Sequence, residues 1–232
     1  MTAGTLFGLG LGPGDPELVT LKALRLLRAA AVVAYPAPER GDSFARSIAA
    51  EWIAPSQREI AISFPMRPGP PPTAIYDSAA ATIAGELEAG RDVAFLCQGD
   101  PFFYGSFAPI FARLAPRYRV VVVPGVSSLV ACAAAAASPL AQRDETVTVI
   151  PATLPEAELT RRLAASDSAA IIKLGRHAEK VRRVLAELRL LDGAIYVERA
   201  SQAREHVGRF AAIEPGEVPY FAMALVLRDR QR

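Results

Sequence analysis

Three short turns contain the residues of this 232-residue chain whose types and spacing could bind a ligand. They read GLGPGDP from Gly10, QGDPFFYG from Gln98 and PGVSS from Pro124. A glycine-rich turn between a strand and a helix often binds phosphate through backbone N–H groups. The first turn does not fit that use, because glycines at 8, 10, 12 and 14 leave neither a GxGxxG nor a GxxxxGK[ST] spacing. Asp15 also stands at the expected helix start, where its carboxylate would repel a phosphate.

Other reactive side chains form no recognisable pattern. His177 and His206 are the only histidines and have no metal-ligand spacing, so we expect surface or packing roles for them. Cys97 and Cys132 are isolated in apolar stretches, which predicts buried, reduced thiols rather than a disulfide or a metal pair. The sequence therefore predicts no metal site.

Each of the three turns follows a short apolar run, at 6–11, 93–97 and 120–123. Runs such as VAFLC and VVVV are continuous, which is typical of parallel strands covered on both faces. A fourth strand is expected at 30–36, directly after a first helix. This strand–helix–strand alternation predicts an open α/β sheet, whose ligands bind beyond the carboxyl ends of the strands. All three turns should lie at that edge.

The first helix is expected to begin at Asp15 as N-cap with Pro16 in the first helical position. Leucines at 18, 21, 24 and 27 predict its apolar stripe. The proline-rich stretch 64–73 should be a loop, followed by a helix that ends at Gly90. Beyond residue 124 we expect helices up to about 137, at 156–165 and at 178–191. Strands are expected there at 146–152, 168–175, 193–201 and 220–228.

Composition limits the class of protein. Half of the residues are apolar and 22% are charged, as in a folded globular protein. A net charge of +2 without a dense basic run argues against nucleic-acid binding. The first residues lack a basic segment followed by an apolar one, and no stretch is apolar for the ~18 residues of a membrane span. We therefore expect a cytoplasmic enzyme or binding protein.

Taken together, the three turns resemble the signatures of the tetrapyrrole methylase family of S-adenosylmethionine-dependent methyltransferases, and the resemblance covers essentially the whole chain. Within that family, GTLFGLGLGPGDPELVTLKALRLL, AYPAP and GDPFFYGSF resemble the precorrin-2 C20-methyltransferase group of cobalamin biosynthesis. Relatives that methylate uroporphyrinogen have an Asp after the corresponding Tyr35 and a Lys further on. Here Pro36 follows Tyr35 and ISFPMRP has no Lys, which argues against that reaction.

The resemblance implies a class III methyltransferase fold: two α/β domains with the active site in the cleft between them. Residues 1–123 would form the tetrapyrrole side of the cleft, and residues 124–232 would complete the S-adenosylmethionine site. Asp100 would be a polar anchor for this co-substrate, which needs no metal. The positions that match the family's co-substrate site are Pro13, Gln98, Gly99, Asp100, Phe103, Ser127, Ser128, Leu174, Ala200 and Ala222.

A tetrapyrrole substrate carries several carboxylates, so it requires arginines, which bind carboxylates through two hydrogen bonds. The candidates for substrate binding at the expected edge of the cleft are Tyr35, Arg40, Arg46, Arg67, Tyr104 and Arg143. No general base is assigned, because S-adenosylmethionine already carries an activated methyl group and transfer mainly requires alignment and a dry site. The family also implies a homodimer.

The expected reaction is methyl transfer to C20 of precorrin-2 or of cobalt-factor II. One alternative keeps the fold and methylates another corrin position. A dinucleotide-dependent oxidoreductase is opposed by the missing GxGxxG and by Asp15. A non-catalytic tetrapyrrole carrier stays open on sequence alone, and methyl transfer from labelled S-adenosylmethionine distinguishes it from an enzyme.

Overall fold

The computed structural model of the chain describes residues 2–64, 72–214, 216, 218–219 and 221–227. They form two compact units, residues 1–127 and residues 128–232, whereas the sequence pattern predicts the boundary after residue 123. Arg67 lies outside the described residues. Among the residues described, no helix combines the length and the apolar character needed to cross a bilayer.

The first unit alternates strands and helices, as expected from its apolar runs. Single turns of 3-10 helix occur at Pro16–Leu18 and Ala50–Trp52. The regular elements are β1 (Leu6–Gly10), α1 (Leu21–Ala29), β2 (Val32–Pro38), α2 (Phe44–Ile48), β3 (Arg58–Phe64), α3 (Thr73–Glu88), β4 (Val93–Cys97), α4 (Phe107–Leu114) and β5 (Val120–Val123).

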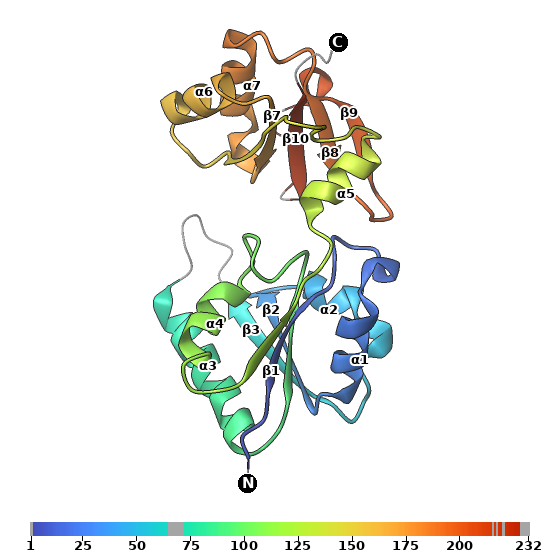
Figure 1. The fold of residues 1–232 in the computed structure, drawn as a ribbon, viewed down its shortest axis with the longest axis vertical. Coiled ribbons are helices and arrows are strands. Elements are labelled where there is room, and N and C mark those ends of the chain that lie inside the picture. The colour runs from blue at the N-terminus through green and yellow to red at the C-terminus, as the bar shows by residue number, and fades with distance from the viewer. Residues whose placement is uncertain (1, 65–71, 215, 217, 220, 228–232) are drawn as a thin grey trace. The chain divides into compact units, whose positions relative to one another are not determined.

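The sheet of the first unit is wholly parallel, in the order β3-β2-β4-β1-β5. Figure 1 shows α3 and α4 on one face and α1 and α2 on the other. Along β4, Val93 and Phe95 pack with α3 and α4, whereas Ala94 and Leu96 pack with α1 and α2. Every residue of β1 and β4 is buried, which explains their continuous apolar sequences.

The start of the first helix differs from the prediction. The Asp15 carboxylate accepts a hydrogen bond from the Glu17 N–H at 2.8 Å, but the turn that it caps is only the 3-10 turn at Pro16–Leu18. The chain then extends, and the Thr20 hydroxyl caps α1 by accepting from the Ala23 N–H at 3.2 Å. This new start changes the helical phase, so Leu21 is 85% exposed and Ala23 and Leu27 face the core. The predicted leucine stripe was therefore wrong for Leu21, whereas Leu27 is buried as predicted and Leu18 and Leu24 are half-buried.

The second unit contains a mixed sheet in the order β6-β7-β10-β8-β9. Helices α6 and α7 pack on one face and α5 on the other. Only β6 and β7 are parallel, and the other neighbours are antiparallel. The elements are α5 (Ser128–Ala135), β6 (Val147–Pro151), α6 (Glu156–Ala164), β7 (Ser168–Ile172), α7 (Ala178–Glu187), β8 (Ile195–Glu198), β9 (His206–Arg209) and β10 (Ala222–Leu227), with 3-10 turns at Gly175–His177 and Phe210–Ala212.

Candidate functional site

The three turns meet at the carboxyl edge of the first sheet, as predicted. Strand β1 pairs with β4 on one side and β5 on the other, so the turns that follow these strands are neighbours. The Leu11 N–H donates to the Cys97 carbonyl at 2.8 Å. Gly12 and Gly99 exchange two backbone hydrogen bonds of 3.3 and 2.7 Å. The first two turns are thereby joined through their backbones.

The third turn packs against the first two without intervening side chains. A Cβ atom built on Gly125 would lie 2.2 Å from the Gly99 carbonyl oxygen, and one built on Gly10 would lie 2.4 Å from the Gly125 nitrogen. Neither distance is possible for a real side chain. Gly8 has a different role: a Cβ there would lie 2.4 Å from the Phe107 ring, which covers β1 and is fully buried. Close packing thus explains Gly8 and Gly10, whereas Gly12 is required by its left-handed backbone with φ +77°.

Asp100 connects the second turn to the third. One carboxylate oxygen accepts from the Phe102 N–H at 2.9 Å, and the other accepts from the Gly125 N–H at 3.1 Å. The first bond caps its own turn, and the second reaches across to the turn that follows β5. Asp100 therefore caps its own turn, as Asp before Pro101 allows, and its bond to Gly125 was not foreseen from the sequence. Both bonds are in addition to the role in ligand binding that the resemblance implies.

The charges of the three turns favour one kind of ligand. Residues 6–18, 97–107 and 123–128 contain no Lys or Arg, but they contain Asp15, Glu17 and Asp100. Carboxylates beside a binding edge repel phosphate and attract cations. The edge therefore suits a ligand that is neutral or positively charged at the atoms that enter it.

The other predicted residues of this edge differ in exposure. Pro13 is buried, and Gln98, Phe103 and Ser127 are half-buried. Tyr104 is 53% exposed and has a left-handed backbone with φ +57°, which is uncommon for a non-glycine residue. Sequence reasoning did not select Phe102, which is 52% exposed with its ring edge-on to Phe111 at 5.0 Å. The one sequence feature that could have identified Phe102 is its position between Asp100 and Tyr104.

Three further predicted positions meet at one edge of the second sheet. Strands β7 and β8 are both antiparallel to β10, so they end where β10 begins. Leu174 follows β7, Ala200 follows β8 and Ala222 begins β10; all three residues are buried. Ser128, also predicted for the site, is the exposed first residue of α5. The predicted co-substrate residues thus form two groups, one in each unit.

Two of the residues predicted for substrate binding, Tyr35 and Arg46, lie beside the same carboxylate, that of Glu59. Arg46 of α2 donates two hydrogen bonds to the Glu59 carboxylate of β3, at 2.6 and 2.9 Å. The pKa of Tyr35 is raised by burial and by the neighbouring Glu59 carboxylate. Arg40 is exposed on the loop after β2, and Arg143 is exposed in the second unit with φ +49°. Arg46 already binds a carboxylate of its own chain, which the sequence pattern could not reveal.

The thiols are unsuited to nucleophilic chemistry. Cys97 and Cys132 are free and buried, as predicted. Burial raises the pKa of Cys97 well above its usual value and that of Cys132 to about 12. Both remain protonated near neutral pH. Within the described part of the chain, no group of three or more His, Cys, Asp or Glu side chains is arranged to hold a metal ion.

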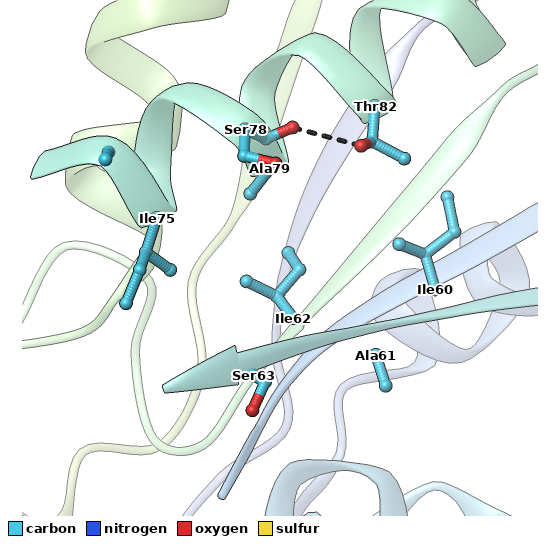
Figure 2. Close-up of a pocket in the computed structure, with 9 residues that line it drawn as sticks. Ile60, Ala61, Ile62, Ser63, Ile75, Ser78, Ala79 and Thr82 are labelled. Carbon is cyan, nitrogen blue, oxygen red and sulfur yellow. Dashed lines mark hydrogen bonds between the residues drawn. The ribbon is translucent and has the colours of Figure 1, made fainter. Parts of the chain in front are cut away.

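A pocket of about 350 Å³ lies elsewhere in the first unit, between β3 and α3 (Figure 2). The residues that line it include Ile60, Ile62, Ser63, Ile75, Ser78 and Thr82. The Thr82 hydroxyl donates to the Ser78 carbonyl at 3.0 Å. Strand β2 separates β3 from β4, and the pocket contains none of the predicted site residues. The edge formed by the three turns is therefore the better candidate site.

Comparison with known proteins agrees with the resemblance of the turns. Residues 5–213 match the family model of the tetrapyrrole (corrin/porphyrin) methylases. The chain is 46% identical to the cobalamin biosynthesis protein CobIJ of Mycobacterium tuberculosis over 99% of its own length and 47% of that protein. It therefore spans about half the length of this relative. It is 40% identical to a precorrin-2 C(20)-methyltransferase of a Sinorhizobium species over 96% of this chain and 95% of that one.

The fold also matches solved structures. The uroporphyrin-III C-methyltransferase of Thermus thermophilus, solved as a complex with S-adenosylhomocysteine, superposes with a TM-score of 0.70 and 26% identity. The match covers 97% of this chain and 98% of that one. The class III methyltransferase fold expected from the sequence is thereby confirmed.

Proposed function

Because the chain belongs to the tetrapyrrole (corrin/porphyrin) methylase family, we propose that it transfers a methyl group from S-adenosylmethionine to C20 of precorrin-2 or of its cobalt-containing counterpart. The support for this reaction is the similarity to the Sinorhizobium enzyme along nearly the full length of both chains. The support for the co-substrate is the Thermus relative, which binds S-adenosylhomocysteine.

The observation that carries this proposal is the meeting of three turns without basic residues at the carboxyl edge of a parallel sheet. S-adenosylmethionine carries a sulfonium and an ammonium group, and both are compatible with a carboxylate such as Asp100. A phosphate-bearing dinucleotide would be repelled there. The backbone contacts of Gly12, Gly99 and Gly125 make this edge rigid, which favours alignment of the two reactants.

We assign co-substrate binding to the predicted residues of the two edges. In the first unit, these residues would bind through backbone groups and the Asp100 carboxylate. In the second unit, Leu174, Ala200 and Ala222 would supply small or apolar surfaces. S-adenosylmethionine supplies the activated methyl group, so the chain needs to orient the reactants and exclude water rather than provide a strong base.

The test is a single-turnover reaction of the purified chain with precorrin-2 and methyl-labelled S-adenosylmethionine under anaerobic conditions. We expect one methyl group to be transferred, and NMR of the product should locate it at C20. Transfer to another carbon would support a different corrin methyltransferase. Binding of the tetrapyrrole without any transfer, also from the cobalt complex, would make the protein a carrier.

We further propose that the protein acts as a cytoplasmic homodimer. The support for the dimer is the family resemblance, and the support for the cytoplasmic location is the composition and the buried, free thiols. Light scattering at micromolar concentration should give twice the mass of one chain. A monomer at that concentration would contradict the dimer without affecting the proposed reaction.

A further inference from the structure

A carboxylate lies beside the group of predicted co-substrate residues in the second unit. Glu198 is the last residue of β8, and its register partner on β10 is Ala222. Its side chain is only 16% exposed. The Tyr196 hydroxyl donates to one carboxylate oxygen at 2.5 Å, and the Arg199 guanidinium donates to the other at 3.0 Å. Each oxygen of this carboxylate therefore has a defined partner.

The network is anchored in the core of the unit. Tyr196 is 1% exposed, and its ring stacks on Phe210 with 6.2 Å between centroids and an interplanar angle of 22°. Burial and the Glu198 carboxylate both raise the pKa of Tyr196, so its hydroxyl stays protonated and remains a donor. Burying a carboxylate is costly unless it is hydrogen-bonded or paired. Glu198 thus couples a fixed core residue to the more exposed Arg199.

The turn after β8 adopts an unusual backbone. Arg199 has φ +50° and Ser201 has φ +64°, a region that L-residues rarely occupy, and Ala200 lies between them. The Arg199 N–H donates to the Phe221 carbonyl at 2.8 Å, and the Ser201 N–H donates to the Glu205 carboxylate at 2.6 Å. Such conformations persist when several contacts enforce them, and they are concentrated at functional sites.

We propose that Glu198 is a positioning residue for S-adenosyl ligands. By binding Arg199 on one side and Tyr196 on the other, it fixes the turn at 199–201 so that Ala200 is presented at the edge shared with Ala222 and Leu174. This inference rests on the proposed function, because it takes Ala200 and Ala222 as contacts of the co-substrate. Glu198 acts through the turn and does not itself touch the ligand.

The test is calorimetric titration of the full chain with S-adenosylhomocysteine. Glu198→Gln should bind about tenfold more weakly, in line with the loss of a charge-assisted hydrogen bond. Arg199→Ala breaks the same link from the other side and should have a similar effect. Because both substitutions remove one link, the double variant should bind within about twofold of either single variant.

Glu158→Gln is the matched control. Glu158 is also a carboxylate of the second unit that accepts hydrogen bonds from arginines, but these arginines, Arg161 and Arg162, lie with it on α6 and not in the turn at 199–201. It should bind S-adenosylhomocysteine like the wild type. Thermal unfolding of each variant reports folding separately, and Arg199→Ala keeps the test available if Glu198→Gln fails to fold.

The proposal would be overturned by wild-type affinity in folded Glu198→Gln. It would also be overturned by equal losses in Glu198→Gln and Glu158→Gln, or by losses that multiply in the double variant. If the wild type does not bind S-adenosylhomocysteine at all, the proposed function fails first. The two failures are therefore distinguishable.

Discussion

The two sheet edges that contain the predicted co-substrate residues are built in different ways. In the first unit, glycines let three turns touch through their backbones, and a Cβ on Gly125 would lie 2.2 Å from a carbonyl oxygen. In the second unit, non-glycine residues adopt left-handed conformations beside a hydrogen-bonded network of Tyr196, Glu198 and Arg199. The first edge should therefore be sensitive to added volume, and the second to changes of charge.

The largest effect is expected from added volume at the first edge. Gly125→Ala should reduce the free energy of unfolding by about 3 kcal/mol, because the new methyl group must displace backbone atoms. Gly85→Ala is the control: nothing lies near its Cβ position on α3, so it should increase stability by about 0.5–1 kcal/mol. Urea denaturation measures both. Similar changes in the two variants would remove the basis for calling the first edge tightly packed.

The next effect separates ligand binding from turn stability at the same edge. Asp100→Ala should weaken S-adenosylhomocysteine binding by about 1–3 kcal/mol in a chain that still folds. Asp92→Ala removes a comparable bond, from the Thr5 N–H to a carboxylate at 2.6 Å, at the amino end of the same sheet. That control should lose stability but keep its affinity in calorimetry. Unchanged affinity in Asp100→Ala would leave Asp100 with only its structural bonds.

A smaller effect is expected at the exposed aromatic side chains of the first edge. Phe102→Ala should raise the Michaelis constant for the tetrapyrrole by the equivalent of about 1 kcal/mol, because the exposed ring is held rigidly against Phe111. Affinity for S-adenosylhomocysteine should not change. Val207→Ala, at an exposed apolar residue of β9 in the second unit, should alter neither constant. Equal increases of the Michaelis constant in the Phe102 and Val207 variants would contradict a contact between the first edge and the substrate.

The smallest effect concerns the ion pair that joins α2 to β3 in the first unit, where charge rather than close backbone contact links two elements. Hydrogen bonding to Arg46 lowers the pKa of Glu59 in the folded protein below its usual value of 4.5. The pair therefore contributes its full stability at pH values above 4.5, and this contribution is lost as the pH falls through the pKa of Glu59 in the folded protein. Because both side chains are partly exposed, Glu59→Gln should cost only about 0.5 kcal/mol at pH ~7 and almost nothing at pH ~2. Urea unfolding at both pH values measures this. Glu187→Gln, at an exposed residue of α7, should show no such difference, and a pH-independent cost for Glu59→Gln would contradict the assignment.

The sequence signal was clearest for strands whose two faces are both covered. Strands β1 and β4 were found because burial on both sides requires continuous apolar runs. The edge strands β3 and β9 were not predicted, because most of their residues are exposed or half-buried and their sequences, REIAISF and HVGR, contain no continuous apolar run of strand length. The start of α1 is also set by a single side-chain cap, the Thr20 hydroxyl, and the spacing of the leucines does not reveal such a cap.

The candidate site was predictable to the same extent. The glycines of the three turns predicted that the turns meet, because backbones can approach this closely only where there is no side chain. Two other contacts could not be predicted from residue types: the bond from Gly125 to Asp100 and the pairing of Arg46 with Glu59. Each joins residues that are distant in sequence and whose types are common elsewhere. The network at Glu198 was missed for a related reason: Tyr and Glu two residues apart are ordinary in a strand.

The central position of β1 has a consequence for the way the chain is made. Among the strands of its sheet it is synthesised first, yet its partners are β4 at Val93–Cys97 and β5 at Val120–Val123. During translation, β1 must therefore wait for most of the first unit to leave the ribosome before either neighbour can pair with it. Once Val123 has emerged, all five strands of that sheet are available and no strand of the second unit is needed to complete it. A nascent chain stalled soon after that point should already resist protease, whereas one stalled before β4 should be cleaved within β1.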